Sequence, residues 1–559
     1  MKKIYVPGSK SVSNRVLVLA ALSSESTILY NLLISNDIIF LKNALIKFGV
    51  IFEEQKNGGL KIIPPKQLKG NNSDNFIGNG GTPARFLVAL STILEGTFSL
   101  KGVERMYERP FLDLFEAIGS FGVDIEYLGQ KGFLPAKFSN KGLETMNRSS
   151  LKISGKVSSQ FISGLLLVAP KFENGLEIEV SEAIQSLPYV KMTVEILKIW
   201  GVSVEVSQNY QKFKILPGLK SPREFLVPAD SSSASYPIAY SLLKKEKISI
   251  ENFGIKTFQG DEKFLEVAEK FGAKVVRFGD KVQIQPPEVL TPLGEIDFST
   301  MPDVSMTGMI LASFSKGYSE FYGLESLRVK ECDRIEAMRQ GLVKLGVRIE
   351  VKDDIVKIWG DEAVFRKDEK ILNSFDDHRI AMVFGIVRLV LKASFQITDQ
   401  ECVAKSWPEF WLELSDWNNE LRSVSAIILE KVQDGGLQYL IVKKPRKDYA
   451  WQFPQGGKEE GEMDKKAAER ELKEECGEDL NVKFKGENSI GDYKYLFPKD
   501  FKRHKKGVFG VHVKFFRADY LNGLVKVDGE EIIDHAWVKK ENLKDFFEVE
   551  YLERIQFFL

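Results

Sequence analysis

The sequence predicts a mixed α/β protein of several domains, most of it built from one α/β unit repeated six times. Polar helix starts recur at intervals of roughly 70–78 residues, which is the signature of a repeat architecture. Stretches between them, such as 176–180 and 202–206, alternate polar and apolar residues as half-buried strands do. The pattern changes after about residue 417, and 559 residues exceed the ~250–300 over which one core usually grows. We therefore expect a second, unrelated domain at the C-terminal end.

The six helix starts share the same composition. Each has Ser, Thr, Asn or Asp as a candidate cap. The residues that follow are apolar around most of the helix, which is typical of a helix that is largely buried. They lie near Ser11, Gly81, Ser159, Ser232, Asp303 and Asp376. A helix start exposes unpaired backbone N–H groups and the positive end of the helix dipole, so it favours anions. One such start needs no ligand, because these caps are common, but six facing one cleft would form an anion site.

The overall charge indicates no particular class of binding partner, because 78 Lys and Arg balance 78 Asp and Glu. Any anion site must therefore come from local clustering of basic residues. Three widely spaced cysteines argue against a disulfide framework or a zinc site. The N-terminus lacks the apolar core of a signal peptide, and no window reaches the ~18 apolar residues of a membrane helix. We expect a cytoplasmic protein.

Basic residues do cluster at the helix starts, within short motifs that recur in a fixed order. The motifs are PGSKSVSNR, GNGGT, ERP, SSQF, SSASY, MPD, RVKECDR, DDHR and AKSWP. In these motifs, residues 1 to about 416 resemble the 5-enolpyruvylshikimate-3-phosphate (EPSP) synthase family. The resemblance implies a two-lobed enolpyruvyl transferase fold of six βαβαββ-type units. A first lobe would cover about 9–228, and a second lobe 1–8 together with 229–416.

The resemblance also implies the reaction and its site, a cleft between the lobes. The enolpyruvyl group of phosphoenolpyruvate would pass to the 5-hydroxyl of shikimate 3-phosphate, with release of phosphate. No cofactor is implied, and a monomer is expected. Shikimate 3-phosphate would be bound by Lys10, Ser11, Arg15, Ser158, Ser159, Gln160, Ser186, Asp303, Ser326 and Lys330. Phosphoenolpyruvate would be bound by Lys10, Asn79, Gly81, Arg109, Gln160, Arg334, Arg379 and Lys405.

Addition followed by elimination requires an acid and a base on opposite sides of one small site. We expect Asp303 to take the hydroxyl proton and Glu331 to handle the proton at C3 of the enolpyruvyl group, with Lys10 sharing that work. Outside these motifs, Asp303 would be read as a helix cap and Glu331 as half of an ion pair.

One alternative within the same fold is the enzyme that transfers enolpyruvyl to UDP-N-acetylglucosamine. That family usually carries a reactive cysteine on a mobile loop. Neither Cys332 nor Cys402 lies in such a context, and the KSVSNR and DDHR runs have the form of the shikimate family.

The C-terminal module begins after a short linker at 417–421 and covers 422–559. Its run GGKEEGEMDKKAAERELKEECGED has the residue spacing of the Nudix hydrolases. On a helix, Glu471, Glu474 and Glu475 share one face and could gather a hard cation, while Arg470 could anchor the helix to the preceding loop. Without the flanking glycines, the same run would be read as an exposed helix with Glu/Lys pairs.

The Nudix resemblance implies an α/β/α sandwich that hydrolyses a nucleoside diphosphate derivative with Mg²⁺ or Mn²⁺. Glu531 would be a fourth metal ligand. The stretch 491–559 also resembles the Nudix-fold protein of the mitochondrial large ribosomal subunit, a type that commonly lacks the catalytic glutamates. A non-catalytic module that binds RNA or protein is therefore the alternative.

Overall fold

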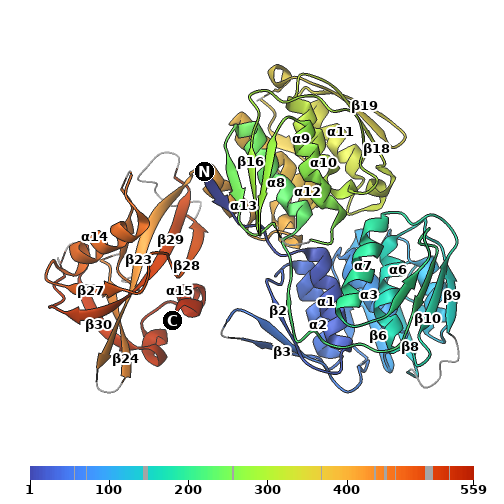
Figure 1. Cartoon of the computed structure of the whole chain (residues 1–559), viewed down its shortest axis with the longest axis horizontal. Helices are drawn as coiled ribbons and strands as arrows, with labels where there is room; N and C mark the ends of the chain where they lie inside the picture. The colour runs from blue at the N-terminus through green and yellow to red at the C-terminus, as the bar shows by residue number, and fades with distance from the viewer. Residues whose placement is uncertain are drawn as a thin grey trace. The chain divides into compact units, whose positions relative to one another are not determined.

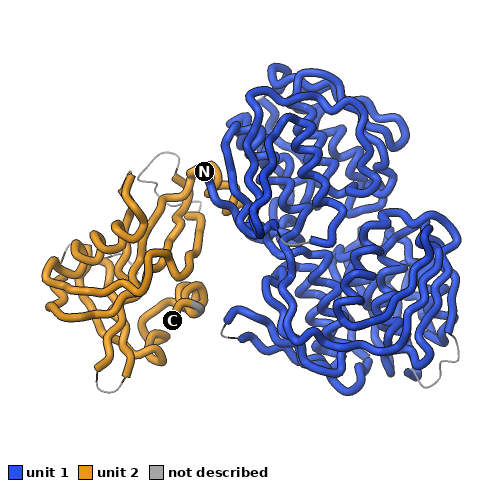
Figure 2. The backbone as a smooth tube through the Cα atoms, in the orientation of Figure 1, with its two compact units in different colours: residues 1–410 blue, residues 411–559 orange. Residues whose placement is uncertain are grey.

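The computed structural model describes most of the chain, which forms two compact units. The described residues are 1–55, 57–70, 72–142, 149–254, 257–366, 368–433, 436–445, 450–459, 461–497, 508–527, 529 and 531–559. The first unit is Met1–Phe410 and the second is Trp411–Leu559 (Figure 2). The sequence placed the first domain boundary at about 416, six residues beyond this division.

The described part of the first unit contains five four-stranded sheets and one two-stranded sheet. Each four-stranded sheet joins a parallel strand pair to two antiparallel strands, and the two-stranded sheet has the parallel pair alone. Three of these sheets, with three inner helices, form the first lobe. They are β13 (Glu224–Leu226), β2 (Thr27–Tyr30), β4 (Leu60–Ile63), β3 (Ile51–Glu54); β5 (Asp74–Phe76), β6 (Gly96–Lys101), β8 (Ala136–Asn140), β7 (Asp124–Tyr127); and β9 (Ser150–Ile153), β10 (Leu176–Val180), β12 (Lys212–Ile215), β11 (Val204–Val206).

The second lobe repeats this arrangement with the three remaining sheets (Figure 1). They are β1 (Lys2–Ile4), β14 (Ile248–Ile250), β16 (Lys281–Gln285), β15 (Lys274–Phe278); β17 (Gly294–Asp297), β18 (Gly317–Tyr322), β20 (Ile355–Gly360), β19 (Arg348–Lys352); and β21 (Ile371–Leu372), β22 (Gln396–Ile397). Strand β1 pairs with β14 in the second lobe although it precedes the whole of the first lobe. The chain therefore crosses between lobes twice, where Gly8 pairs with Ala229.

The six predicted inner helices are confirmed, each starting within about two residues of its predicted position. They are α1 (Lys10–Leu22), α3 (Gly81–Leu90), α6 (Ser159–Val168), α8 (Ser231–Lys244), α10 (Ser305–Phe314) and α12 (His378–Leu391). In the first lobe α3 packs on α6 and α1, and in the second α8, α10 and α12 pack together. Apolar residues all around these helices suit burial on most of their surface.

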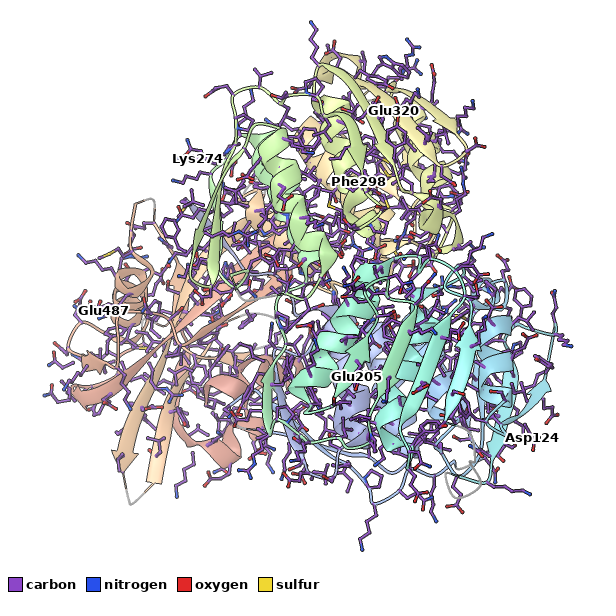
Figure 3. The ribbon with its side chains drawn as sticks, turned by 45° about the vertical axis from the view of Figure 1, so that its right-hand side comes forward. Asp124, Glu205, Lys274, Phe298, Glu320 and Glu487 are labelled. Atoms are coloured by element: carbon purple, nitrogen blue, oxygen red, sulfur yellow. The ribbon has the colours of Figure 1, made fainter. Side chains whose placement is uncertain are left out.

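Outer helices and the edge strands face solvent. The outer helices are α2 (Asn36–Lys47), α5 (Leu112–Gly119), α7 (Leu187–Ile199), α9 (Phe264–Lys270) and α11 (Arg334–Lys344). Asp124, Glu205 and Lys274 are exposed on the outer strands β7, β11 and β15 (Figure 3). Phe298, by contrast, is fully buried and stacks on Phe321 inside the second lobe. None of the helices within the described ranges is both long and apolar enough to cross a bilayer.

The cap residues explain four of the six helix starts. Side chains of Ser9, Ser158, Asp230 and Asp377 each accept a hydrogen bond from a backbone N–H of the first turn of the helix. The start of α3 has Gly80 at this position, and α10 follows a short 3₁₀ turn, Pro302–Val304, without a side-chain cap. The interpretation of Asp303 as a simple helix cap is therefore wrong.

The second unit is a sheet of eight described strands with helices on its two faces. The strands are β23 (Leu421–Gln433), β24 (Gly436–Lys443), β25 (Trp451–Gln452), β26 (Gln455–Gly457), β27 (Asn481–Phe484), β28 (Gly491–Leu496), β29 (Gly510–Asn522) and β30 (Asp534–Lys539). Alternate residues of β23 join two separate cores. One core includes Ala468 and Leu472 of α14 (Asp464–Cys476), and the other includes Ile555 of α15 (Val549–Ile555).

A network of charges fixes helix α13 (Phe410–Trp417) to strands of the second unit. Lys494 on β28 lies 2.9 Å from Glu413 and 3.0 Å from Asp416 of α13. His512 on β29 lies 3.4 Å from Asp416 and 2.7 Å from Asp492. Burial opposes a charged imidazole, but the hydrogen bonds to the two aspartates outweigh it and raise the pKa of His512.

Replacing Lys494 with Met is expected to destabilise the second unit, because Glu413 and Asp416 would remain half-buried without their shared cation. Removing one partner of a buried ion pair costs roughly 3 kcal/mol at the low end of the usual range. Chemical denaturation followed by Trp fluorescence measures the loss. The matched control is Lys526→Met, whose ion pair with Asp479 is exposed and whose loss should leave the transition in place. Equal transitions for Lys494→Met and the wild type would contradict the prediction.

Candidate active site

A pocket in the first unit gathers residues from both lobes. Most of the predicted ligands line it: Lys10, Ser11, Arg15, Gly81, Arg109, Ser158, Ser159, Gln160, Ser186, Asp303, Ser326, Lys330, Glu331, Arg334 and Arg379. Asn79 and Lys405 lie just behind this lining. Lys405 Nζ donates to Asn79 O at 2.8 Å, and Arg109 Nη1 donates to Asn79 O at 3.1 Å. Five of the six helix starts predicted from the sequence thus contribute residues to this lining, whereas the start of α8 contributes none.

The pocket lining also includes residues that the sequence did not predict as ligands. They are Asp37, Thr82, Arg85, Pro110, Val157, Gln185, Tyr189 and Val329. The sequence could have predicted Arg85 as a ligand, because it lies one helical turn after Gly81 of the GNGGT motif. Asp37 and Tyr189 carried no such signal, because their approach to the pocket depends on how α2 and α7 pack.

Gly81 allows two arginines to reach the start of α3. A Cβ at this position would collide with the guanidinium groups of Arg109 and Arg85. Arg85 Nη1 donates to Gly81 O at 3.1 Å and its guanidinium lies 4.6 Å from the centre of the Phe111 ring. Two buried guanidinium groups therefore lie against the first residue of α3, where their charge adds to the positive end of the helix dipole.

Arg334 is held by three carboxylates while its side chain is 2% exposed. Its Nε donates to Asp377 Oδ2 at 2.7 Å, Nη1 to Asp303 Oδ1 at 2.9 Å and Nη2 to Glu331 Oε2 at 2.8 Å. A buried guanidinium requires such partners, because desolvating it alone costs several kcal/mol. The two carboxylates expected to carry the chemistry are thus bound to the same cation.

Glu331 is surrounded by cations. Lys405 Nζ lies 2.6 Å from Glu331 Oε1, on the opposite side from Arg334. Burial alone would favour the neutral acid, but Lys405, Arg334 and Arg109 together hold the pKa of Glu331 well below its usual range. The ion-pair interpretation of Glu331 is correct for this state of the site.

Asp303 has a similar environment. Arg379 Nη2 lies 3.2 Å from Asp303 Oδ2, and Lys330 Nζ lies 3.5 Å from Asp303 Oδ1. Burial opposes ionisation, but Arg379, Lys330 and Arg334 outweigh it and hold the pKa of Asp303 well below its usual range. Both candidate proton carriers are therefore anions in this structure.

Lys10 and Arg15, from the first helix start, differ in how they are satisfied. Lys10 lies 3.7 Å from Asp37, and burial lowers its pKa although Asp37 acts in the opposite direction. Arg15 is 1% exposed and donates to Ser11 O, Thr193 Oγ1 and the Tyr189 carbonyl at 2.7–3.1 Å. Lys10 thus keeps donors available toward the pocket, whereas Arg15 is largely occupied by protein groups.

Hydrogen bonds join the lobes across the pocket. Arg105 Nε, in the first lobe, donates to Glu331 O at 3.2 Å, and its Nη2 donates to Lys330 O at 3.3 Å. Lys405 in the second lobe donates to Asn79 O in the first. The two lobes are therefore in contact, and the cationic and anionic side chains of the pocket form ion pairs with one another.

In the second unit, Arg470 anchors α14 to the preceding loop, as predicted. Its Nη2 donates to Gly457 O at 2.8 Å and pairs with Glu462 at 3.0 Å. Its Nη1 donates to Glu471 and Glu474, each at 2.9 Å. Glu474 is 54% exposed, so it faces solvent more than its two neighbours do.

Glu471 and Glu475 lie on the buried side of α14, next to β26. A Cβ on Gly456 would collide with the Glu471 carboxylate, so the glycine leaves a cradle for that group. Glu475 accepts a hydrogen bond from Gln455 N at 3.0 Å and pairs with Lys444. Burial raises the pKa of Glu475 to about 7, although Lys444 lowers it. Two carboxylates therefore share this cradle.

Hard cations prefer oxygen donors such as these, so Glu471, Glu475 and the Gly456 backbone suit a divalent metal ion. Within the described residues, however, no group of three or more acidic, His or Cys side chains converges on one point. Glu531 is exposed and lies in a bend shortly before β30. The donor set therefore fits a metal ion in part, and Lys444 and Arg470 now neutralise it.

Comparison with known proteins finds a family for each unit. Residues 1–414 match the family model of EPSP synthase (3-phosphoshikimate 1-carboxyvinyltransferase), and residues 420–555 match that of the NUDIX domain. A 3-phosphoshikimate 1-carboxyvinyltransferase of Shewanella loihica is 35% identical over 419 residues, covering 74% of this chain and 96% of the relative. One from Haemophilus influenzae is 38% identical over 420 residues, covering 73% and 95%.

Solved structures agree on the fold. An EPSP synthase from Acinetobacter baumannii superposes with a TM-score of 0.61 at 25% identity, over 74% of this chain and 95% of that one. The enolpyruvyl transferase NikO from Streptomyces tendae gives 0.59 over 74% and 94%, and at 15% identity it supports the fold alone. The chain therefore belongs to the EPSP synthase family through residues 1–414, and it continues into a NUDIX domain at residues 420–555.

Proposed function

We propose that the pocket of the first unit binds shikimate 3-phosphate and phosphoenolpyruvate, transfers the enolpyruvyl group to the 5-hydroxyl and releases phosphate. This is the activity of the family, and it places the chain in the shikimate pathway toward chorismate and the aromatic amino acids. The observation that carries the proposal is the convergence of basic residues from both lobes on two ionised carboxylates, Asp303 and Glu331.

We assign the two substrates to the two sides of the pocket. Shikimate 3-phosphate meets the starts of α1 and α6 with Ser186, Ser326, Asp303 and Lys330, in the arrangement that the family resemblance implies. Phosphoenolpyruvate meets Lys10, Gly81, Arg109, Arg334 and Arg379, with Asn79 and Lys405 behind them. Gln160 serves both, and its amide donates to Thr82 Oγ1 at 3.0 Å in this structure. Arginine forks suit the phosphate and carboxylate groups of these ligands.

Binding of the anions changes the proton affinity of the two carboxylates. Arg379 and Arg334 now contact Asp303, and phosphoenolpyruvate would draw the same guanidiniums onto its own charges. Because those cations hold down the pKa of Asp303, sharing them with the substrate raises it. Asp303 then accepts the proton of the 5-hydroxyl as its oxygen attacks C2 of the enolpyruvyl group.

The same argument applies to the pKa of Glu331, on the opposite side of the site. Lys405, Arg334 and Arg109 keep it ionised in this structure, and each is a proposed phosphoenolpyruvate ligand. As they turn to the substrate, Glu331 can carry a proton, deliver it to C3 and remove one when phosphate leaves. Lys10, whose pKa is lowered by burial, is suited to share that transfer.

The alternative acceptor, UDP-N-acetylglucosamine, finds less support. Cys332 lies next to Glu331 with its sulfur 3.7 Å from Asp377 Oδ2. Burial and Asp377 raise the pKa of this thiol far above its usual range, so it stays protonated and unreactive. Cys402 also has a raised pKa, for which burial is the main cause.

The transferase prediction is that inorganic phosphate is released from phosphoenolpyruvate only when shikimate 3-phosphate is present. Asp303→Ala and Lys10→Ala should each abolish the release, because they remove the proposed base and a buried cation. A coupled phosphate assay measures it. Asp74→Ala, at an exposed ion pair with Lys101, is the matched control and should keep wild-type activity. Equal turnover with UDP-N-acetylglucosamine would overturn the acceptor assignment.

We also propose the finer architecture and setting implied by the resemblance. The repeated unit is of βαβαββ type, and among the described residues the sixth copy has the parallel pair β21 and β22 alone. The second unit is an α/β/α sandwich, with α14 and α15 packed into its two separate cores. We also propose a cytoplasmic enzyme that is monomeric through its transferase part, as the family resemblance implies.

For the second unit we propose a Mg²⁺-dependent pyrophosphohydrolase acting on a nucleoside diphosphate derivative. Glu471 and Glu475 would hold Mg²⁺ or Mn²⁺, with Glu474 and Glu531 as further ligands; the ion would supply an activated water. Arg470 fixes the helix against Gly457 and so orients the carboxylates. Lys444 is the competing cation on Glu475 and must yield to the metal.

A non-catalytic RNA- or protein-binding module is the second candidate. The observation in its favour is that Lys444 and Arg470 already neutralise Glu475, Glu471 and Glu474, so the fold needs no metal ion there.

A screen of the full chain with Mg²⁺ over nucleoside diphosphate derivatives, dinucleoside polyphosphates and capped RNA decides between the two. We expect release of phosphorylated products by the wild type and a loss of roughly 100-fold or more in Glu475→Gln, since a metal ligand would be removed. Glu474→Gln should reduce the rate as well. Glu469→Gln, an exposed residue of the same helix, is the control. If the wild type and both variants are equally inert, the binding-module proposal is favoured.

A further inference from the structure

A second buried carboxyl group lies behind Asp303, outside the pocket lining. Asp261 is 2% exposed and sits in a short 3₁₀ turn, Gly260–Lys263. Its Oδ2 accepts a hydrogen bond of 2.5 Å from Ser232 Oγ at the start of α8. Asp261 belongs to none of the ligand sets proposed above, and nothing in the reaction so far uses it.

Tyr189 joins this carboxyl group to the site. The Tyr189 hydroxyl lies 2.9 Å from Asp303 Oδ2 and 3.4 Å from Asp261 Oδ2. Tyr189 stands in the first turn of α7, and its carbonyl accepts a 3.1 Å hydrogen bond from Arg15 Nη2. One phenol from the first lobe therefore spans two carboxyl groups of the second.

Backbone packing holds this arrangement in place. Gly260, immediately before Asp261, is so close to its surroundings that a Cβ would collide with Thr300 O and lie 3.0 Å from Pro188 Cβ. Thr300 precedes Asp303 by three residues, and Pro188 precedes Tyr189. The three segments that carry the phenol and the two carboxyl groups thus meet at Gly260.

The protons available cannot satisfy two carboxylates at once. A phenol has one proton and can donate it to only one of them. Asp303 faces the cations of Arg379, Lys330 and Arg334, and Glu331 lies nearby. Asp261 faces the Ser232 hydroxyl, Tyr189 and the carboxylates of Asp303 and Asp230, with Arg379 as its nearby cation.

The difference in surroundings decides which group keeps a proton. Two carboxyl groups that share one site do not ionise together easily. Burial first, and then Asp303, raise the pKa of Asp261 to about 7, so near neutrality it keeps a proton that Asp303 does not. A protonated Asp261 can donate to the Tyr189 oxygen, which leaves the phenol proton for Asp303.

We propose that Asp261 is a positioning residue for Asp303, acting through Tyr189, whose hydroxyl it aims at Asp303 Oδ2. This rests on the proposed role of Asp303 as the group that accepts the 5-hydroxyl proton. When Asp261 ionises, both carboxylates compete for the single phenol proton and the hydrogen bond to Asp303 is weakened. Turnover therefore falls as the pH rises through the ionisation of Asp261.

The test is the pH profile of kcat for the full chain, with shikimate 3-phosphate and phosphoenolpyruvate saturating. Asp261→Asn keeps an N–H donor toward Tyr189 but cannot ionise, so it should keep kcat within about threefold at pH 6 and lose the decline that the wild type shows near pH 7. Tyr189→Phe should lower kcat by roughly 10-fold or more, because the base is no longer oriented. In the Tyr189→Phe background, Asp261→Asn should have no further effect.

Two further variants provide a second test and a control. Ser232→Ala removes a hydrogen bond that favours the Asp261 anion, so the decline in kcat should move to higher pH. Glu251→Gln alters a buried carboxylate of the same lobe that pairs with Lys281 away from the pocket, and its profile should match the wild type. Thermal melting of each variant verifies folding, and Ser232→Ala carries the test if Asp261→Asn does not fold.

Superimposable pH profiles for the wild type, Asp261→Asn and Ser232→Ala would overturn the proposal. Independent, multiplying effects of Asp261→Asn and Tyr189→Phe would do so as well. A wild-type chain that transfers no enolpyruvyl group at any pH would instead overturn the proposed function, so the two failures can be told apart.

Discussion

The active site depends on the burial of Arg334 among three carboxylates. A guanidinium 2% exposed to water is tolerated only because Asp377, Asp303 and Glu331 surround it. These three residues come from the start of α12, the turn before α10 and the segment before α11. The ion pairs therefore fix the relative placement of three helix starts in the second lobe. Other cations of the pocket pair with two of the same carboxylates.

Pairing with carboxylates also explains how the fold accommodates so many cations in one pocket. Lys405, Arg379 and Lys330 complete their coordination with Glu331 and Asp303, so the concentration of cations is tolerated by the fold. The lobes are joined by hydrogen bonds from Arg105 and Lys405 across the pocket. In the proposed reaction, the anionic substrates would take over cations from these internal partners. Substrate binding would then itself change the proton affinity of Asp303 and Glu331.

In the second unit, buried carboxylates are also neutralised by nearby cations, but fewer groups take part. Glu475 is buried at the edge of the β26 cradle and Lys444 neutralises it, while Arg470 bridges Glu471 and Glu474. In both units, charged groups that would suit the proposed ligands are paired with protein counterions. The difference is that the second unit has two buried carboxylates at its cradle, whereas the first has a network spread over five helix starts.

The sequence by itself determined the repeat, the six inner helix starts, the two families and most of the charged residues that line the pocket. It could do so because caps, apolar periodicity and basic motifs are local features that lie close together in the chain. Asp37, Tyr189 and Asp261 were decided only by the tertiary structure, because α2, α7 and the turn at Gly260 bring them to the site from segments with no motif. The sequence placed Glu471, Glu474 and Glu475 on one helix face, but packing against Gly456 and the position of Lys444 separated two buried carboxylates from an exposed one. Local spacing fixes which residues share a helix; the counterions each one meets are fixed by elements far away in the chain.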